Sequence, residues 1–486
     1  MTMKRAAAMI ALSLFPRLLV AQELDIAALE GEDWYGLYFG GQKAGYAVST
    51  LSLEDDGSVR LRVDAQFKVN QGGKAQDLRV LEERRYDATG ALTAVLSESG
   101  GAMQPTRFVG TVQGDEFVLN SRVGGTEQTV RLPRPSESIA DALKEVRLVQ
   151  GDPKPGRAIA YTRFEAMFQK EVTGRTEITG VEERVLNGAA TKVYRVETTE
   201  QIDESNTIES SAWIAEDGTV LEDDIASVLV MRLEPKEVAQ DVDYSNDVIV
   251  SNAALVDTAV RDPRTRETLR LRLEGPLRPN HLITDERQEL TASNGGFEFV
   301  GRRISLDGFT PATLPITDGE AAEWLERTTF IQSDDPRIVA LAREIVGDET
   351  DAFRAVEKLS GWVSEHVRTS YSASISNALE VLDTLEGDCT EHSVLFVALA
   401  RAAGIPAREV AGLIYVGTPE PGFYFHMWAK AWIGKWIDVD PTFNQPLADA
   451  THIKLAEGDM MQLTRLVPII GRITVHVDEE QGAAAP

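Results

Sequence analysis

Hydrophobic and polar residues alternate along the first half of the chain, which is the pattern of strands with one buried face. In the clearest run, residues 59–69, apolar side chains at odd positions alternate with charged or polar ones at even positions. Residues 191–197 and 208–214 predict a further pair of strands. Between such runs lie dipeptides typical of tight turns, namely Asp56-Gly57, Asn187-Gly188 and Asp217-Gly218. Residues 25–240 are therefore predicted to form an antiparallel β domain, a large curved sheet or half-barrel, with a break at residues 152–156.

A second, shorter β segment is predicted over residues 241–315. Leucines at 269, 271 and 273 alternate with arginines, and residues 297–300 form a further apolar run.

Helical periodicity replaces the strand pattern near Gly319. Apolar residues then recur at spacings of three and four, as Phe353, Val356, Leu359, Val363 and Val367, with Thr350 or Asp351 able to cap the helix. Residues 394–403 are almost continuously apolar, which predicts a short buried helix that ends at Gly404. We expect an α+β domain over residues 316–470 and a tail over residues 471–486, of which 478–486 are acidic, then small, and predicted to be disordered.

Composition supports a multidomain protein. The chain has 486 residues, 43% hydrophobic and 26% charged, which indicates two to four globular domains. Its net charge of −28 disfavours nucleic acid as a partner and leaves no basic patch for anionic lipid. No segment is apolar over a length that could stably span a membrane.

The N-terminus resembles an export signal. Residues 1–5 are basic, residues 6–15 are apolar, and Leu19-Val20-Ala21 before Gln22 is a plausible cleavage site. The alternative is an N-terminal helix. We expect residues 1–21 to be removed and the mature protein to be periplasmic or secreted.

Cys389 is the only cysteine, so the chain has no internal disulfide framework. It lies in Gly387-Asp388-Cys389-Thr390-Glu391-His392, where a loop becomes the buried helix. Free amides and the helix dipole at that end are expected to stabilise a thiolate, and the Cys389 amide can donate to an oxyanion. Asp388 and Glu391 would oppose the thiolate if their charges face it.

Downstream lie His426, in His426-Met427-Trp428, and Asp440, in Val439-Asp440-Pro441-Thr442. Cysteine, histidine and aspartate in this order supply a nucleophile, a base and a group that orients the base. Asp438 is a competing carboxylate.

The hairpin between His426 and Asp440 decides whether these two residues can meet. A two-residue turn at Gly434-Lys435 pairs Ile433 with Trp436 and turns His426 and Asp440 to opposite faces. A three-residue loop or a bulge brings them to one face. In that second register Trp428 lies opposite Asp440, and Asp438 lies opposite Lys430, further from His426.

These motifs, with Gly404-Ile405-Pro406-Ala407-Arg408 after the helix, resemble the transglutaminase-like superfamily of papain-type fold. The resemblance implies Cys389 as nucleophile, His426 as base and then acid, and Asp440 as orienter. Lys430 departs from the acidic residue expected shortly after the histidine. The first predicted hairpin, around Trp34-Tyr35-Gly36, is similar to periplasmic β domains of the lipoprotein-carrier type, although a β domain with no ligand of its own fits the same pattern.

The other histidines, and a possible metal pair, are also considered. Cys389 and His392 could suggest a zinc pair, but further ligands at suitable spacing are lacking, so we expect no metal and no cofactor. His392 and His452 are interpreted mainly as structural histidines.

The sequence therefore predicts acyl transfer by a thiol enzyme on amide or peptide bonds of a protein or peptide substrate. Hydrolysis or deamidation is favoured over crosslinking, because it needs no second substrate site. The alternative is an exported binding or scaffold protein in which the thiol domain is degenerate and the β domain binds an apolar ligand or an envelope partner.

Overall fold

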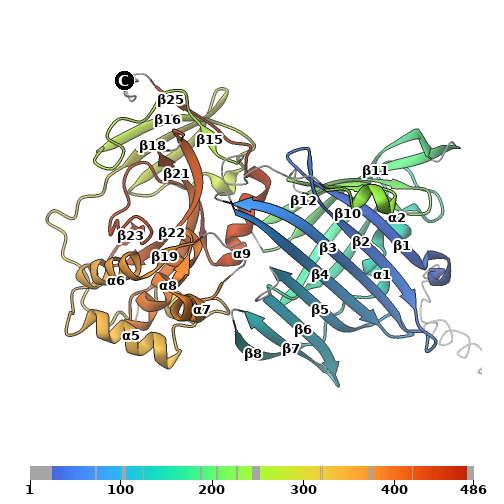
Figure 1. The fold of residues 1–486 in the computed structure, drawn as a ribbon, viewed down its shortest axis with the longest axis horizontal. Helices are drawn as coiled ribbons and strands as arrows, with labels where there is room; N and C mark the ends of the chain where they lie inside the picture. Colours follow the sequence, from blue (N-terminus) through green and yellow to red (C-terminus); the bar gives the residue numbers. More distant parts are fainter. Residues whose placement is uncertain are drawn as a thin grey trace, which may run out of the picture.

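The structure is a computed structural model that describes residues 24–71, 74–100, 106–123, 125–186, 189–203, 206–225, 228–242, 252–317, 319, 321–370, 376–418 and 420–478. The predicted export signal, the Asn187-Gly188 turn and residues 479–486 of the predicted tail lie outside the described residues. The described chain forms two halves, with the N-terminal half at the right and the C-terminal half at the left of Figure 1.

The N-terminal half is one large antiparallel sheet, which contains fourteen strands within the described residues and is not closed. Neighbouring strands follow the order β8-β7-β6-β5-β4-β3-β2-β1-β14-β13-β12-β11-β10-β9, so β8 and β9 are its two edges. The strands are β1 (Gly31–Phe39), β2 (Gln42–Leu53), β3 (Val59–Gln71), β4 (Lys74–Tyr86), β5 (Leu92–Gly100), β6 (Thr106–Gln113), β7 (Glu116–Val123), β8 (Thr126–Pro133), β9 (Ala158–Glu165), β10 (Lys170–Leu186), β11 (Ala189–Gln201), β12 (Thr207–Ala215), β13 (Val220–Ile225) and β14 (Leu229–Leu233). The predicted antiparallel β architecture is confirmed.

Two short helices, α1 (Ile139–Ala142) and α2 (Lys144–Val149), connect the two edge strands and pack against β9 and β10. The predicted turn at Asp217-Gly218 joins β12 to β13 and lies against α2. Gly218 has a φ of +91°, and a Cβ atom there would lie 2.6 Å from the Cα of Val146, so both conformation and space require glycine.

The C-terminal half is built around α8 (Cys389–Ala402). Its side chains from Glu391 to Arg401 are buried, because α5 (Pro336–Val346), α6 (Ala352–His366) and α7 (Ala378–Thr384) pack on it from one side. From the other side it contacts a five-stranded antiparallel sheet. This sheet contains β15 (Ala254–Leu255), β21 (Ala407–Val416), β22 (Gly422–Trp432), β23 (Trp436–Val439) and β24 (Ile453–Gly458). Asp351 caps α6 and Gly404 follows α8 with a φ of +78°, as the sequence predicts.

A third sheet covers the far face of this half. It contains the predicted strands β16 (Thr268–Glu274) and β18 (Gly296–Arg302), with β17 (Gln288–Ser293) and β25 (Thr474–Val477). Its apolar face shares one core with β21, β22 and β24. The structure differs from the predicted tail at β25, which pairs with β16 because Val475 and Val477 extend that apolar face.

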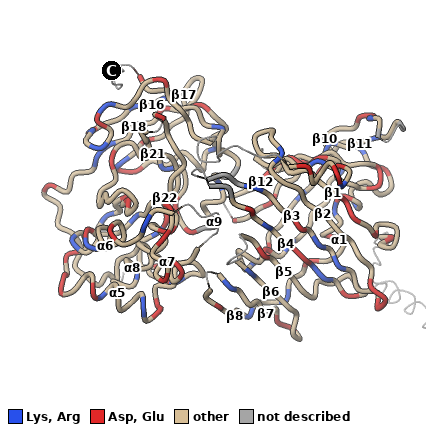
Figure 2. The backbone as a smooth tube through the Cα atoms, viewed as in Figure 1, with Lys and Arg blue, Asp and Glu red and all other residues tan. Residues whose placement is uncertain are grey.

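The remaining elements are short: α3 (Lys236–Ala239), β19 (Arg368–Thr369), β20 (Glu386–Gly387) and α9 (Met460–Leu463). Among the described residues, no helix combines the length and the apolar character that a membrane crossing requires. Acidic and basic residues are spread over both halves (Figure 2).

The two halves touch through named contacts. Phe330, from the C-terminal half, is buried in the core of the β half together with Phe117 and Phe164. Close by, Gln169 Nε2 donates to Thr329 Oγ1 at 2.9 Å. The Asn377 side chain, which caps α7, donates to the carbonyl of Val123 at the end of β7.

Candidate thiol site

Cys389 is the first residue of α8, and a capping box fixes the start of that helix. Asp388 accepts from the amide of Thr390 at 2.8 Å, and Glu391 accepts from the amide of Asp388 at 2.8 Å. Gly387 is the last residue of β20, and a Cβ there would lie 2.2 Å from the Cβ of Glu391. Glycine is therefore needed for Glu391 to close the box, and this positions the half-buried Cys389 at the helix end.

His426 lies in β22 and Asp440 directly follows β23. His426 Nε2 lies 2.9 Å from Asp440 Oδ2, and both side chains are buried. Trp432 pairs with Trp436, and Lys430 with Asp438, so the hairpin has the three-residue loop 433–435. The two-residue turn is therefore wrong, and the second predicted register, which brings His426 and Asp440 to one face, is confirmed.

Asp440 is held on both sides of its carboxylate. Its Oδ1 accepts from the amides of Thr442 at 2.9 Å and Phe443 at 3.2 Å, and its Oδ2 faces His426 and His452, each at 2.9 Å. Burial by itself would raise the pKa of Asp440, but the two histidines outweigh burial and hold the pKa well below its usual value. Asp440 is consequently an ionised acceptor with a fixed orientation.

The charge around the thiol differs from the sequence-based expectation. Burial and, next, the Asp388 carboxylate raise the pKa of Cys389 well above its usual value, although a hydrogen bond from the backbone of Met427 opposes them. Burial first, and then the two acidic residues of the capping box, therefore oppose the thiolate that the sequence predicts at the helix end. Burial and the nearby Asp388 also raise the pKa of Glu391 to about 8.

The Met427 contact places the sulfur beside the strand that carries His426. Asp440 contacts Nε2 of His426, so Nδ1 is the ring nitrogen that Asp440 does not engage. Around the imidazole, Trp428 is fully buried, with its ring centroid 6.1 Å from that of His426, and Phe443 lies 5.4 Å away and is 42% exposed. The site therefore has a closed wall at Trp428 and an open rim at Phe443.

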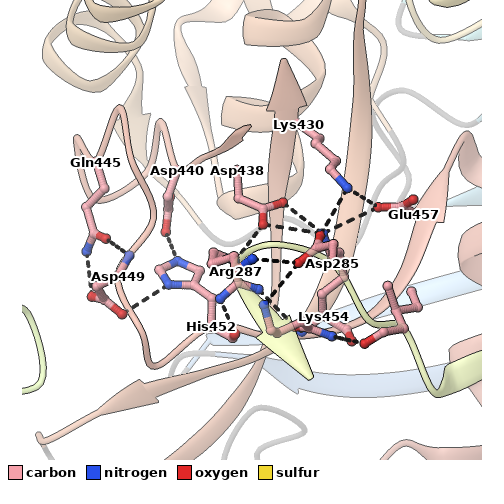
Figure 3. Close-up of polar contacts among 12 residues, drawn as sticks. Asp285, Arg287, Lys430, Asp438, Asp440, Gln445, Asp449, His452, Lys454 and Glu457 are labelled. Carbon is pink, nitrogen blue, oxygen red and sulfur yellow. Dashed lines mark hydrogen bonds and ion pairs between the residues drawn. The ribbon is translucent and has the colours of Figure 1, made fainter. Parts of the chain in front are cut away.

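Asp438, the competing carboxylate, belongs to a separate buried ion network (Figure 3). It accepts from Arg287 Nε at 2.5 Å and from Lys454 Nζ at 3.3 Å. Lys430 joins the same network through Asp285 at 3.2 Å and Glu457 at 3.0 Å. Asp438 is therefore bonded to Arg287 and Lys454 and not to His426. Lys430, which differs from the acidic residue that the resemblance leads one to expect, is paired with acidic residues of its own.

The two other histidines that the sequence singled out have different surroundings. His392 has Nδ1 2.7 Å from the carbonyl of Asp388 and Nε2 3.1 Å from that of Val367, as a structural histidine would. His452 instead contacts Asp440, which sequence reasoning missed. No spacing rule connects it to Asp440, and the turn Asp449-Ala450-Thr451-His452 is the only local hint in that stretch.

One group of side chains has the composition of a metal site. The potential ligand atoms of His426, Asp440 and His452 lie within 4.8 Å of one another. Hydrogen bonds from the two histidines to Asp440 Oδ2 account for this grouping without an ion.

Comparison with known proteins finds a family resemblance over part of the C-terminal half. Residues 339–441 match the model of the transglutaminase-like superfamily. An uncharacterized protein of Haemophilus influenzae is 30% identical over 125 residues, which cover 25% of this chain and 34% of that protein. An uncharacterized protein of Mycobacterium leprae is 29% identical over 102 residues, or 20% of this chain and 35% of that protein. The chain thus spans about a third of the length of these relatives.

Among solved structures, the chain is similar to "a Putative Cysteine Protease from Cytophaga hutchinsonii". The similarity covers 44% of this chain and 82% of that protein, at 19% identity and a TM-score of 0.31.

Proposed function

We propose, on the premise that residues 339–441 form a transglutaminase-like domain, that the protein is a thiol enzyme that transfers acyl groups from amide or peptide bonds. Cys389 is the nucleophile, His426 the base and Asp440 the residue that orients the base. The observation that carries the proposal is the contact between His426 Nε2 and Asp440 Oδ2, which leaves Nδ1 for the thiol.

The reaction follows from the protonation states. The raised pKa of Cys389 keeps the resting thiol protonated, so His426 must remove the proton as the sulfur attacks the carbonyl carbon. The C–N bond then breaks, His426 returns the proton to the leaving amine, and a thioester remains on Cys389. Water, deprotonated by His426, attacks the thioester, which releases a carboxylic acid and restores the thiol. The amide of Cys389, at a helix N-terminus, is available to the oxyanion.

Hydrolysis is the favoured outcome, since the reaction with water needs no second substrate. If an amine replaced water, the same thioester would give a crosslink. We propose a protein or peptide as the substrate, and a location outside the cytoplasm on the strength of the N-terminal signal pattern. N-terminal sequencing of protein recovered from fractionated cells checks the location, and an intact residue 1 in the cytoplasmic fraction would contradict it.

The test uses a proteome-derived peptide mixture and mass spectrometry. Hydrolysis of a peptide bond adds water across that bond, deamidation converts a side-chain amide into an acid with loss of ammonia, and crosslinking joins two peptides with loss of ammonia. We expect one of these products with the full chain and none with Cys389→Ala or His426→Ala. His366→Ala, which removes an exposed histidine stacked on Trp362, is the matched control and should leave the products unchanged. Product formed at the full rate by Cys389→Ala would refute the mechanism.

A second candidate function has its own observation. Inside the β half, a cavity of about 690 Å³ is bordered by β1, β2, β3, β4 and the α1–α2 segment. The protein would then be a binding protein in which this cavity holds the ligand. Native mass spectrometry of the full-length chain distinguishes the two: a retained small molecule together with an unreactive thiol would favour binding over catalysis.

A further inference from the structure

A line of polar contacts runs from Asp440 through His452 to Asp449 (Figure 3). His452 places Nε2 2.9 Å from Asp440 Oδ2 and Nδ1 3.2 Å from Asp449 Oδ1. Asp449 Oδ2 in turn accepts from Arg264 Nη1 at 2.8 Å. His452 is fully buried, so water does not substitute for either carboxylate.

The second carboxylate, Asp449, is itself held in place. Its Oδ1 accepts from the amide and the hydroxyl of Thr451, at 2.8 and 2.6 Å. Gln445 donates from Nε2 to Asp449 Oδ2 at 3.0 Å, while its backbone forms reciprocal bonds of 2.8 Å with the backbone of Asp440. Gln445 therefore fixes the distance between the two carboxylates that His452 joins.

Both ring nitrogens of His452 face carboxylate oxygens, and a carboxylate can only accept. Each contact is therefore a hydrogen bond only if its nitrogen carries a proton, which makes the ring a cation. Burial would lower the pKa of His452, but the Asp440 and Asp449 carboxylates outweigh burial and raise it above its usual value. Among the described residues, Asp440 then accepts from four donors: His426, His452 and the amides of Thr442 and Phe443.

We propose that His452 is a positioning residue of the thiol site, which fixes Asp440 from behind and sets the basicity of His426. This inference rests on the proposed function, because it deepens the role of the same His426 and Asp440 pair. His452 touches neither the thiol nor the reacting carbonyl. It acts through Asp440, to which it donates a hydrogen bond at the oxygen that His426 also uses.

The charges around His426 explain how His452 would affect the basicity of His426. Asp440 is its one directly contacting carboxylate among the described residues, and His452 is a cation whose ring centroid lies 6.1 Å from that of His426. Asp449 and Arg264 lie beyond His452 and balance each other, and the uncharged Trp428 ring borders both histidines. The nearby cation disfavours a second positive charge on the neighbouring ring, so the loss of His452 should change how readily His426 accepts the thiol proton.

The experiment measures the pKa of His426 directly by NMR of the full-length chain with labelled histidine. The chain has six histidines, and His426→Ala assigns the resonance. In His452→Phe the cation and both donors are lost, so the pKa of His426 should rise by about 1 unit or more. The rate of Cys389 alkylation at neutral pH should fall about ten-fold, the usual loss when a residue that orients a functional group is removed.

His452→Gln is the conservative variant. It loses the charge but keeps an N–H for Asp440, so we expect the higher pKa of His426 with a partly restored alkylation rate. It also keeps the proposal testable if His452→Phe does not fold, which circular dichroism would reveal. His281→Phe is the matched control, because it removes another buried histidine, one bonded to the backbone of Arg278 and Arg465, and should change neither quantity.

An unchanged pKa of His426 in the folded His452→Gln variant would overturn the proposal. That failure is distinct from failure of the proposed function. If His426→Ala leaves alkylation of Cys389 unchanged, the thiol mechanism is wrong. If His426→Ala slows alkylation but the His452 variants behave like the wild-type chain, only the positioning role is wrong.

Discussion

At the scale of single residues, the Cys389 sulfur lies near two acidic side chains and near the backbone of Met427, on the strand that carries His426. Asp388 and Glu391 start the helix well but oppose a thiolate. The structure thus favours a site in which the base takes the proton during attack, over a site with a preformed ion pair.

The carboxylate of Asp388 can be removed without removing the helix cap. Asn is as good an N-cap as Asp, so Asp388→Asn should cost well under about 1 kcal/mol of stability. After burial, the Asp388 carboxylate is the largest cause of the raised pKa of Cys389, and the substitution removes it. We expect the pKa of Cys389 to fall and alkylation at neutral pH to speed up. The pH dependence of alkylation by iodoacetamide measures this.

Asp383→Asn is the control, since Asp383 is exposed on α7 and pairs with Arg337. An unshifted alkylation profile in Asp388→Asn would show that burial alone raises the pKa of the thiol.

Asp438 is expected to matter for stability. In Asp438→Asn the buried Arg287 and Lys454 lose their common partner, which should lower the free energy of unfolding by about 3–5 kcal/mol. The pKa of Asp438 is below its usual 3.8, so its contribution is present above that pH and is lost as the pH falls further. Urea unfolding at several pH values should therefore show the largest difference between wild type and variant near neutral pH.

Glu286→Gln provides the comparison, because its pair with Lys435 is exposed and is worth at most about 1 kcal/mol. Equal losses in the two variants would mean that the buried network is not what stabilises this region.

The sequence was sufficient to single out Cys389, His426 and Asp440 as candidates, because each lies in a local motif, and the structure brings His426 and Asp440 into contact. The sequence could not find the role of His452 or the constraint on Asp438. Arg264, which holds Asp449 beside His452, and Arg287, which holds Asp438, come from a β segment more than a hundred positions earlier, and only folding brings these charges together. The sequence also could not predict whether the pKa of the thiol is raised or lowered, since this depends on which way Asp388 and Glu391 point.

At the scale of elements, one loop decides whether the base and its orienting residue meet. The alternation of β22 and β23 fits two registers equally well, because side chains repeat every second residue. The sequence therefore left both open, and the three-residue loop 433–435 selects the one that serves the site. By contrast, the buried helix α8, the amphipathic α6 and the alternating β3 were predictable, since each carries its own apolar period.

Deleting Gly434 tests this directly. A two-residue turn would shift the register by one and turn Asp440 to the face opposite His426. We expect alkylation of Cys389 to become insensitive to His426, so that adding His426→Ala changes nothing further. The measurement is the alkylation profile of the single and double variants.

Gly434→Ala keeps the loop length and serves as the control. Gly434 has a φ of +103°, so alanine should cost about 1 kcal/mol or more of stability while the contact between His426 and Asp440 remains. A deletion variant that keeps the full His426 effect would mean that a bulge elsewhere restores the register.

At the scale of the whole molecule, the C-terminal half is joined to the β half through Phe330, whose ring lies in the core of the other half. No periodicity in the sequence predicts such a contact, because Phe330 precedes α5 in a segment without regular structure. Phe330→Ala should lower the free energy of unfolding by about 3 kcal/mol, as for other buried phenylalanines. Phe443→Ala, an equal truncation at a side chain that is 42% exposed, should cost much less.

The same variant separates two roles for the β half. Phe330 packs in a different core from the one that borders Cys389, so alkylation of Cys389 should be unchanged in Phe330→Ala at temperatures where the variant is folded. If the β half presents a polypeptide to the thiol, weaker docking should lower activity on polypeptides but not on short peptides. Equal activity on both would mean that the β half stabilises the protein without delivering the substrate. Small-angle scattering, which detects a looser arrangement of the halves, shows whether the docking has changed.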